Sequence, residues 1–229
     1  MPESTRRHIL SEFDVALNSL RDNLLMMASL TQRNLDRART GLLLRDEDHC
    51  NTAIADDEEI DILETQMDSE GMRLLMRFQP LASDLRVVIA TMKISVNLEH
   101  ISDLAVNIAR RVRKLIALSP IPQTDQLDIL FEDTTKMLAD AVQAFALNNL
   151  SLAFSLKARA RGAIATSHEC AAEITHRMSF ETGDSLQVYL ELIYIVRYLE
   201  QVAGLCANIG EDTVLAFSKH PTEPKDYLE

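Results

Sequence analysis

The sequence is poor in residues that break or reverse a polypeptide chain. Its 229 residues include only six glycines and six prolines, and tryptophan is absent. So few turn-forming residues over this length predict few, long elements. Leu, Ala, Met, Glu and Arg are frequent, and all of them favour helices. We therefore expect an all-α protein.

The sequence also lacks an excess of basic residues. Its formal net charge is −12, so the chain as a whole is repelled by the phosphate backbone of nucleic acids. This charge excludes DNA or RNA as the expected partner. It suits cations or partners with basic surfaces instead.

Three further absences concern the compartment and the chemistry. The cysteines, Cys50, Cys170 and Cys206, are odd in number and far apart, which is typical of a reducing cytosol. No apolar run follows the N-terminus, and the longest uncharged stretch, 141–156, is too short to span a bilayer. No phosphate loop, nucleophile elbow or Ser/His/Asp motif is present. We expect a cytoplasmic protein without membrane insertion, and not an enzyme.

The few breaks predict six helices. They cover about 4–40, 46–78, 83–118, 126–148, 150–178 and 184–218. The second ends before Pro80, because the residue before a proline resists the α conformation, and Ser119–Pro122 is the strongest break. Several of these helices are far longer than the usual ~11–12 residues. Such helices need neighbours, so we expect them side by side in bundles.

The third and sixth predicted helices are related by an offset of 101 positions. Over 24 aligned positions without a gap, eight residues are identical. Amphipathic patterning alone does not require Glu99 to match Glu200 or Asn107 to match Asn208, so we infer an internal duplication. The predicted fold is two tandem, pseudo-symmetric three-helix bundles of antiparallel, spectrin-like helices. They cover 1–119 and 120–220, and a disordered tail follows at 221–229.

The third predicted helix carries acidic residues on a face that is otherwise apolar. Glu99, Asp103 and Asn107 are spaced four apart, so they share one face, and Met92 and Val96 continue that face toward the N-terminus. We expect the two carboxylates to point into the bundle. Burial of an unpaired carboxylate costs several kcal/mol, so basic partners, protonation or a cation must compensate.

The second predicted helix supplies more acid rather than base. Asp57 and Asp61 share a face, which Glu64 and Asp68 continue. A solvated acidic face is the ordinary explanation of such a stripe. If the two helices are antiparallel neighbours, however, four carboxylates converge and a bound metal relieves their repulsion. The oxygen ligands suggest a hard ion such as Mg, Mn, Fe or Ca. We predict a metal site at Asp57, Asp61, Glu99 and Asp103, with Asn107 nearby.

The second half departs from this pattern. Gly204 stands at the position equivalent to Asp103, and residues 154–168 contain no carboxylate. That stretch carries Lys157, Arg159 and Arg161 instead, which are candidates to pair with Glu200 or with the acids of a partner. Gly204 allows a close backbone approach at some cost in helix propensity. We therefore expect metal in the first repeat only.

Four basic residues lie close together at the end of the third predicted helix: Arg110, Arg111, Arg113 and Lys114. Cations near a helix C-terminus interact favourably with the helix dipole. The alternative is a docking patch for an acidic partner.

Two runs, 81–86 and 98–108, together with the second copy at 197–200 and 208–211, resemble the signature of the PhoU family. The resemblance implies two three-helix bundles with multinuclear metal sites on E/DxxxD motifs; the metal would be Fe, Mn, Mg or Zn. It implies a cytoplasmic accessory protein of the phosphate ABC transporter. Such a protein restrains uptake and keeps the phosphate-sensing histidine kinase silent when phosphate is plentiful.

From this resemblance we expect a negative regulator that contacts the transporter ATPase subunit and the kinase, as a homodimer. The rival interpretation is a helical-bundle metalloenzyme that uses the same carboxylates. A third is a purely structural bundle whose acids pair with arginines.

Overall fold

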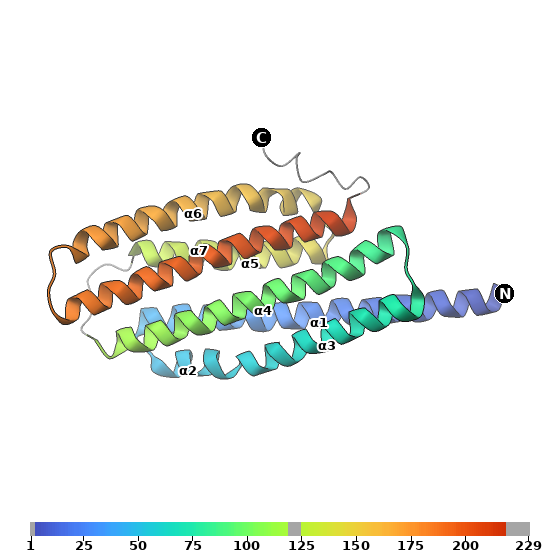
Figure 1. Ribbon diagram of the computed structural model, residues 1–229, viewed down its shortest axis with the longest axis horizontal. Helices are drawn as coiled ribbons and strands as arrows, with labels where there is room; N and C mark the ends of the chain where they lie inside the picture. The colour runs from blue at the N-terminus through green and yellow to red at the C-terminus, as the bar shows by residue number, and fades with distance from the viewer. Residues whose placement is uncertain (1–2, 119–124, 219–229) are drawn as a thin grey trace.

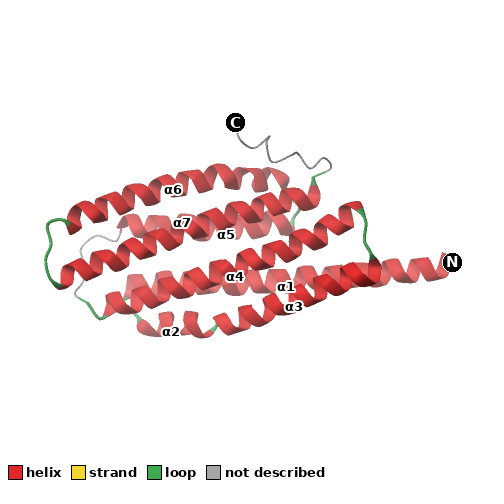
Figure 2. Cartoon of the chain, in the orientation of Figure 1, coloured by secondary structure: helices red, strands yellow, loops and turns green. Residues whose placement is uncertain are grey.

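The computed structural model describes residues 3–118 and 125–218, and every element within them is an α-helix (Figures 1 and 2). The helices are α1 (Glu3–Leu44), α2 (Glu47–Ala55), α3 (Asp57–Phe78), α4 (Ala82–Ile116), α5 (Asp125–Ala146), α6 (Leu150–Met178) and α7 (Asp184–Phe217). The all-α prediction is confirmed. The predicted break at 119–122 and the predicted tail at 221–229 lie outside the described residues.

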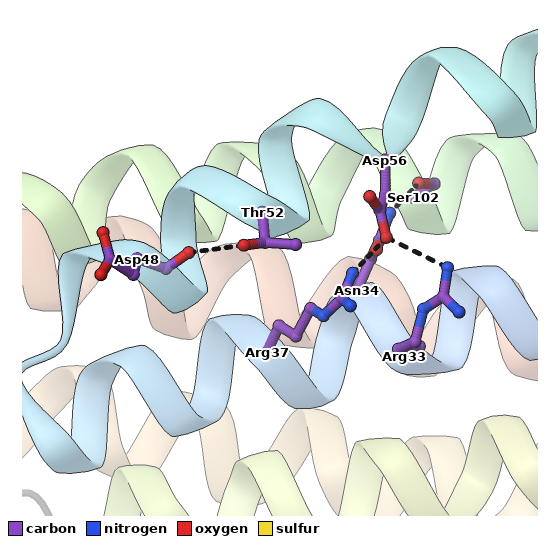
Figure 3. A network of polar contacts seen from close by, with 7 residues as sticks. All are labelled: Arg33, Asn34, Arg37, Asp48, Thr52, Asp56 and Ser102. Carbon is purple, nitrogen blue, oxygen red and sulfur yellow. Dashed lines mark hydrogen bonds and ion pairs between the residues drawn. The ribbon is translucent and has the colours of Figure 1, made fainter.

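One predicted helix is broken in two. The stretch 46–78 forms α2 and α3, which meet at Asp56. From α1, Arg33 donates to Asp56 over 3.1 Å and Arg37 donates to the same carboxylate oxygen (Figure 3). The first turn of α3 is acidic, which favours a helix start because the helix dipole is positive there. We had interpreted these acids as a continuous stripe rather than as a second start.

The helices form two antiparallel sets that lie against each other. α1 packs with α2, α3 and α4, and α5 packs with α6 and α7. α4 and α7 run side by side through the middle of the molecule (Figure 1). Fully buried residues of both, such as Leu98 of α4 and Leu199 of α7, belong to one cluster that extends through both halves. The two sets of helices therefore share one large hydrophobic core.

Two carboxylates of α7 form salt bridges with α4, near opposite ends of the contact between the two helices. Arg111 lies 3.0 Å from Glu191, and Lys93 pairs with Asp212. Both carboxylate side chains are only 5% exposed. In each bridge α4 supplies the cation and α7 supplies the acid. This arrangement disfavours pairing of α4 with another α4, because two sets of cations would then meet at the same interface.

Candidate metal centre in the first repeat

Asp57, the first residue of α3, is held by a short polar chain. The Ser102 hydroxyl of α4 donates to Asp57 Oδ1 over 2.6 Å. Asn34 of α1, which is fully buried, donates from Nδ2 to Ser102 Oγ over 3.5 Å. The Asn34 and Ser102 side chains lie beside the Asp56 network that anchors the start of α3 (Figure 3). Contacts from α1 and α4 thus fix the position of Asp57 at the start of α3.

The acids of α3 and α4 affect one another. Burial raises the pKa of Asp57, the Ser102 hydrogen bond lowers it, and the charges of Asp61 and Asp103 raise it further. Burial likewise raises the pKa of Glu99, and Asp103 adds to that rise. These carboxylates therefore lie within electrostatic range of one another across the two helices.

The depth of the carboxylates differs from our expectation. Asp61 and Asp103 are exposed and the Glu99 side chain is 27% exposed, so these acids do not point into the core. Val96, which we placed with them on a buried face, is 42% exposed. The reason is that α4 buries its other faces against α1 and α7, which leaves the Glu99 stripe along the outer edge beside α3. Sequence patterning could not tell these apolar faces apart.

The donor set fits a hard cation in its chemistry. Carboxylate oxygens from two neighbouring helices are the ligands that such ions prefer. Within residues 3–118 and 125–218, no Lys or Arg forms an ion pair with Asp57, Asp61, Glu99 or Asp103. In the same described residues, no three His, Cys, Asp or Glu side chains converge closely enough to hold an ion. Ligation would therefore require the exposed acids to turn toward one another.

In the second repeat, the carboxylate of Glu200, which is equivalent to Glu99, already has partners that offset its charge. Glu200 Oε2 accepts hydrogen bonds from Arg197 over 2.8 Å and from the Ser167 hydroxyl over 3.3 Å. Its other oxygen lies 3.5 Å from His168 Nε2. A carboxylate with these partners does not need a cation to offset its charge.

Two expectations about this half were wrong. The ion pairs of Lys157 and Arg159 are with Glu211 and Asp140 rather than with Glu200, whereas the pairing of these cations with a partner's acids stays a prediction. Gly204 is not a point of close approach either, because a Cβ built there meets no atom within 4 Å. The cation beside Glu200 is instead Arg197, which lies one helical turn before it on α7.

Sequence reasoning missed Ser102 and Asn34, which position Asp57. Both are polar and fully buried. A polar residue inside an otherwise apolar helical face is a signal that could have found Ser102. Asn34 has no such signal, because its role depends on how α1 packs against α4.

No helix in the described ranges has the length and apolarity needed to cross a bilayer. The fold and the stripe of acids together define a class of protein: a duplicated three-helix unit with a carboxylate-rich outer edge in one copy. The PhoU domain family matches this chain twice, at residues 24–112 and 127–213. The two matched segments correspond to the two halves inferred from the offset of 101.

Relatives and solved structures agree with that match. A phosphate-specific transport system accessory protein PhoU homolog from Pseudomonas putida is 31% identical over 210 residues, which cover 91% of this chain and 82% of that protein. The accessory protein PhoU of Escherichia coli K12 is 27% identical, over 90% of this chain and 85% of its own length.

The crystal structure of PhoU from Pseudomonas aeruginosa aligns with a TM-score of 0.85 at 28% identity, over 88% of this chain and 97% of that one. The crystal structure of the phosphate transport system regulatory protein PhoU from Streptococcus pneumoniae aligns with a TM-score of 0.83 at 26% identity, over 92% of this chain and 99% of that one. The chain belongs to the PhoU family. This is a family of regulatory proteins, so the chain is not an enzyme, and the metalloenzyme interpretation is not retained.

Proposed function

We propose that this protein is a negative regulator of phosphate uptake and of phosphate-starvation signalling. It acts in the cytoplasm as an adaptor between the ATPase subunit of the phosphate ABC transporter and the phosphate-sensing histidine kinase. The observation that carries the proposal is the match of both repeats to the PhoU domain, in a chain whose relatives are named phosphate-specific transport accessory proteins.

A complementation experiment tests this function. In a cell that lacks its own copy of the gene, phosphate-starvation genes should stay active at high phosphate, and this chain should switch them off. The readout is a starvation-promoter reporter at high and low phosphate, with the chain expressed at a matched level. Continued expression of the reporter at high phosphate, from a folded and abundant chain, would contradict the proposal.

We also propose a metal centre in the first repeat. Asp57, Asp61, Glu99 and Asp103, with Asn107 beside them, would hold a divalent or trivalent ion, either Fe, Mn, Mg or Zn. The bound ion would neutralise the clustered acids and brace α3 against α4. The pKa values of Asp57 and Glu99 support this: burial raises both, and the charges of Asp61 and Asp103 raise both further, which places negative charge from α3 and α4 close together.

Metal analysis of the purified protein tests the centre. Asp61→Ala with Glu99→Ala should remove the bound metal, whereas Glu200→Ala should leave the metal content unchanged because Glu200 already has basic partners. Equal metal content in the parent chain, in the Asp61→Ala, Glu99→Ala double variant and in Glu200→Ala would rule out this site.

Two further parts of the proposal concern organisation. We propose repeats at 1–119 and 120–220, and a homodimer. Light scattering of the purified chain over a range of concentrations measures the oligomeric state. A monomer at all concentrations would exclude the dimer.

A further inference from the structure

The end of α4 carries a basic hollow that adjoins the metal centre at Asn107. Its volume is about 650 Å³, and Arg110, Arg111, Arg113 and Lys114 line it together with Glu47 of α2. These are the four cations that the sequence placed at the helix end. Four basic side chains around one opening contrast with a net charge of −12 for the whole chain.

Complementation of the helix dipole does not explain this cluster. The end of α4 is capped from the turn between α1 and α2, because Arg45 donates to the carbonyl oxygens of Leu115 and Ile116 over 3.1 and 2.8 Å and to that of Leu118, just beyond the helix, over 2.6 Å. Arg45 thus brings both hydrogen bonds and positive charge to the negative end of the helix. The cations of the hollow are therefore not needed to cap this helix end.

The hollow already binds carboxylates of this chain. Arg113 lies 2.9 Å from Glu47, and Arg111 and Lys114 lie 3.0 and 3.6 Å from Glu191. Arg110, in contrast, is exposed; among the described residues it donates a 3.4 Å hydrogen bond to Asn107 and its charge lowers the pKa of Asp57, but no ion pair holds it. Arg110 and the 55% exposed Lys114 side chain are therefore the cations most available to an incoming acid.

The chemistry favours an acidic protein segment over other anions. A small-molecule site buries most of its ligand among convergent groups, whereas the Arg113 and Lys114 side chains here are 45% and 55% exposed. A nucleic acid or an anionic bilayer presents a long array of negative charge, which the acidic remainder of the surface repels. A short acidic segment reaches the hollow without meeting that repulsion.

We propose that the basic hollow is the docking site for an acidic segment of a protein partner. This inference rests on the proposed adaptor function, and it adds the surface and the charge of the contact. The partner's carboxylates pair with Arg110 and Lys114 in the way that Glu47 and Glu191 already pair with their neighbours.

Binding measurements with two proteins test the proposal: the transporter ATPase subunit and the cytoplasmic part of the sensor kinase. The variant is Arg110→Gln, which loses a hydrogen bond to Asn107 and the charge that lowers the pKa of Asp57, but no ion pair, so we expect it to fold. Arg110→Glu with Arg113→Glu reverses two charges. The control is Arg161→Gln, which removes an exposed cation from α6. Each is measured by calorimetry at low and high salt.

For one of the two proteins we expect the dissociation constant to rise about threefold for Arg110→Gln and at least about tenfold for the charge reversal. The control, Arg161→Gln, should bind with the same dissociation constant as the parent chain, and high salt should raise the dissociation constant of the parent chain. Unchanged affinity of the charge reversal for both partners would overturn the docking site and leave the adaptor function standing. A chain that bound neither protein would overturn both. Loss of binding only to phosphatidylglycerol vesicles, or only to inorganic phosphate, would reassign the hollow to those ligands.

Discussion

The Arg111–Glu191 bridge allows a quantitative prediction about the α4–α7 interface. Glu191 is buried, with a side chain 5% exposed, and its two basic neighbours, Arg111 and Lys114, both come from α4. The Arg111 guanidinium also lies over the Tyr194 ring, 4.1 Å from its centroid. Arg111→Ala would remove the closer cation and the ring contact together, and would leave Glu191 with only Lys114 at 3.6 Å.

The size of the effect follows from these contacts. Removal of one partner of a buried ion pair costs about 3–5 kcal/mol, and an exposed cation–π contact is worth about 0.5–1 kcal/mol. Lys114 retains part of the pairing, and Arg111 is 24% exposed, so both figures are reduced. We expect the free energy of unfolding to fall by about 2–3 kcal/mol, or about 4–12 °C in Tm for a chain of this size.

Urea denaturation followed by circular dichroism measures this change. Arg111→Ala with Glu191→Gln should recover part of the loss, because the buried charge is then gone. Arg113→Ala is the control: its bridge to Glu47 is about half exposed on both sides and should cost less than about 1 kcal/mol. If Arg111→Ala unfolded at the same urea concentration as the parent, the bridge would not stabilise the interface and the reasoning would be refuted.

Four other outcomes can be measured. Burial raises the pKa of Glu99. The protonated carboxyl group of Glu99 therefore stabilises the folded protein below the unfolded pKa of about 4.3, and this stability is lost as the pH rises through the folded pKa. Glu99→Gln should accordingly stabilise the metal-free protein at neutral pH, and not near pH 4, in urea titrations. Gly204→Ala should raise the free energy of unfolding by up to about 1 kcal/mol. Gly210→Ala should lower it, because the new Cβ would lie 2.8 Å from a backbone oxygen of α6. Equal effects of the two substitutions would contradict the close packing of α7 against α6 at Gly210. Chelation should increase hydrogen exchange in α3 more than in α6. Burial raises the pKa of Cys206 to about 12, so its thiol should stay unreactive toward a disulfide reagent until the protein unfolds.

The sequence by itself determined the helical class and the duplication. Because glycine and proline are scarce, the sequence favours a few long helices. The match of Glu99 with Glu200 at a constant offset of 101 positions indicates the repeat. The four-residue spacing of Asp57 and Asp61, and of Glu99 and Asp103, placed each pair on one helical face. Local periodicity decides such features, because each depends only on positions along one helix.

Tertiary structure decided what those residues meet. An apolar face at helical spacing does not reveal which neighbour covers it, so Glu99 and Asp103 were expected deeper than they lie. The break at Asp56 depends on Arg33 and Arg37, which lie about 20 residues earlier on another helix. The shared core through both halves and the bridge from Arg111 to Glu191 likewise join residues far apart in the chain. Only the packing of α4 against α7 brings them together, because side chains distant in sequence interact only after the helices have found their neighbours.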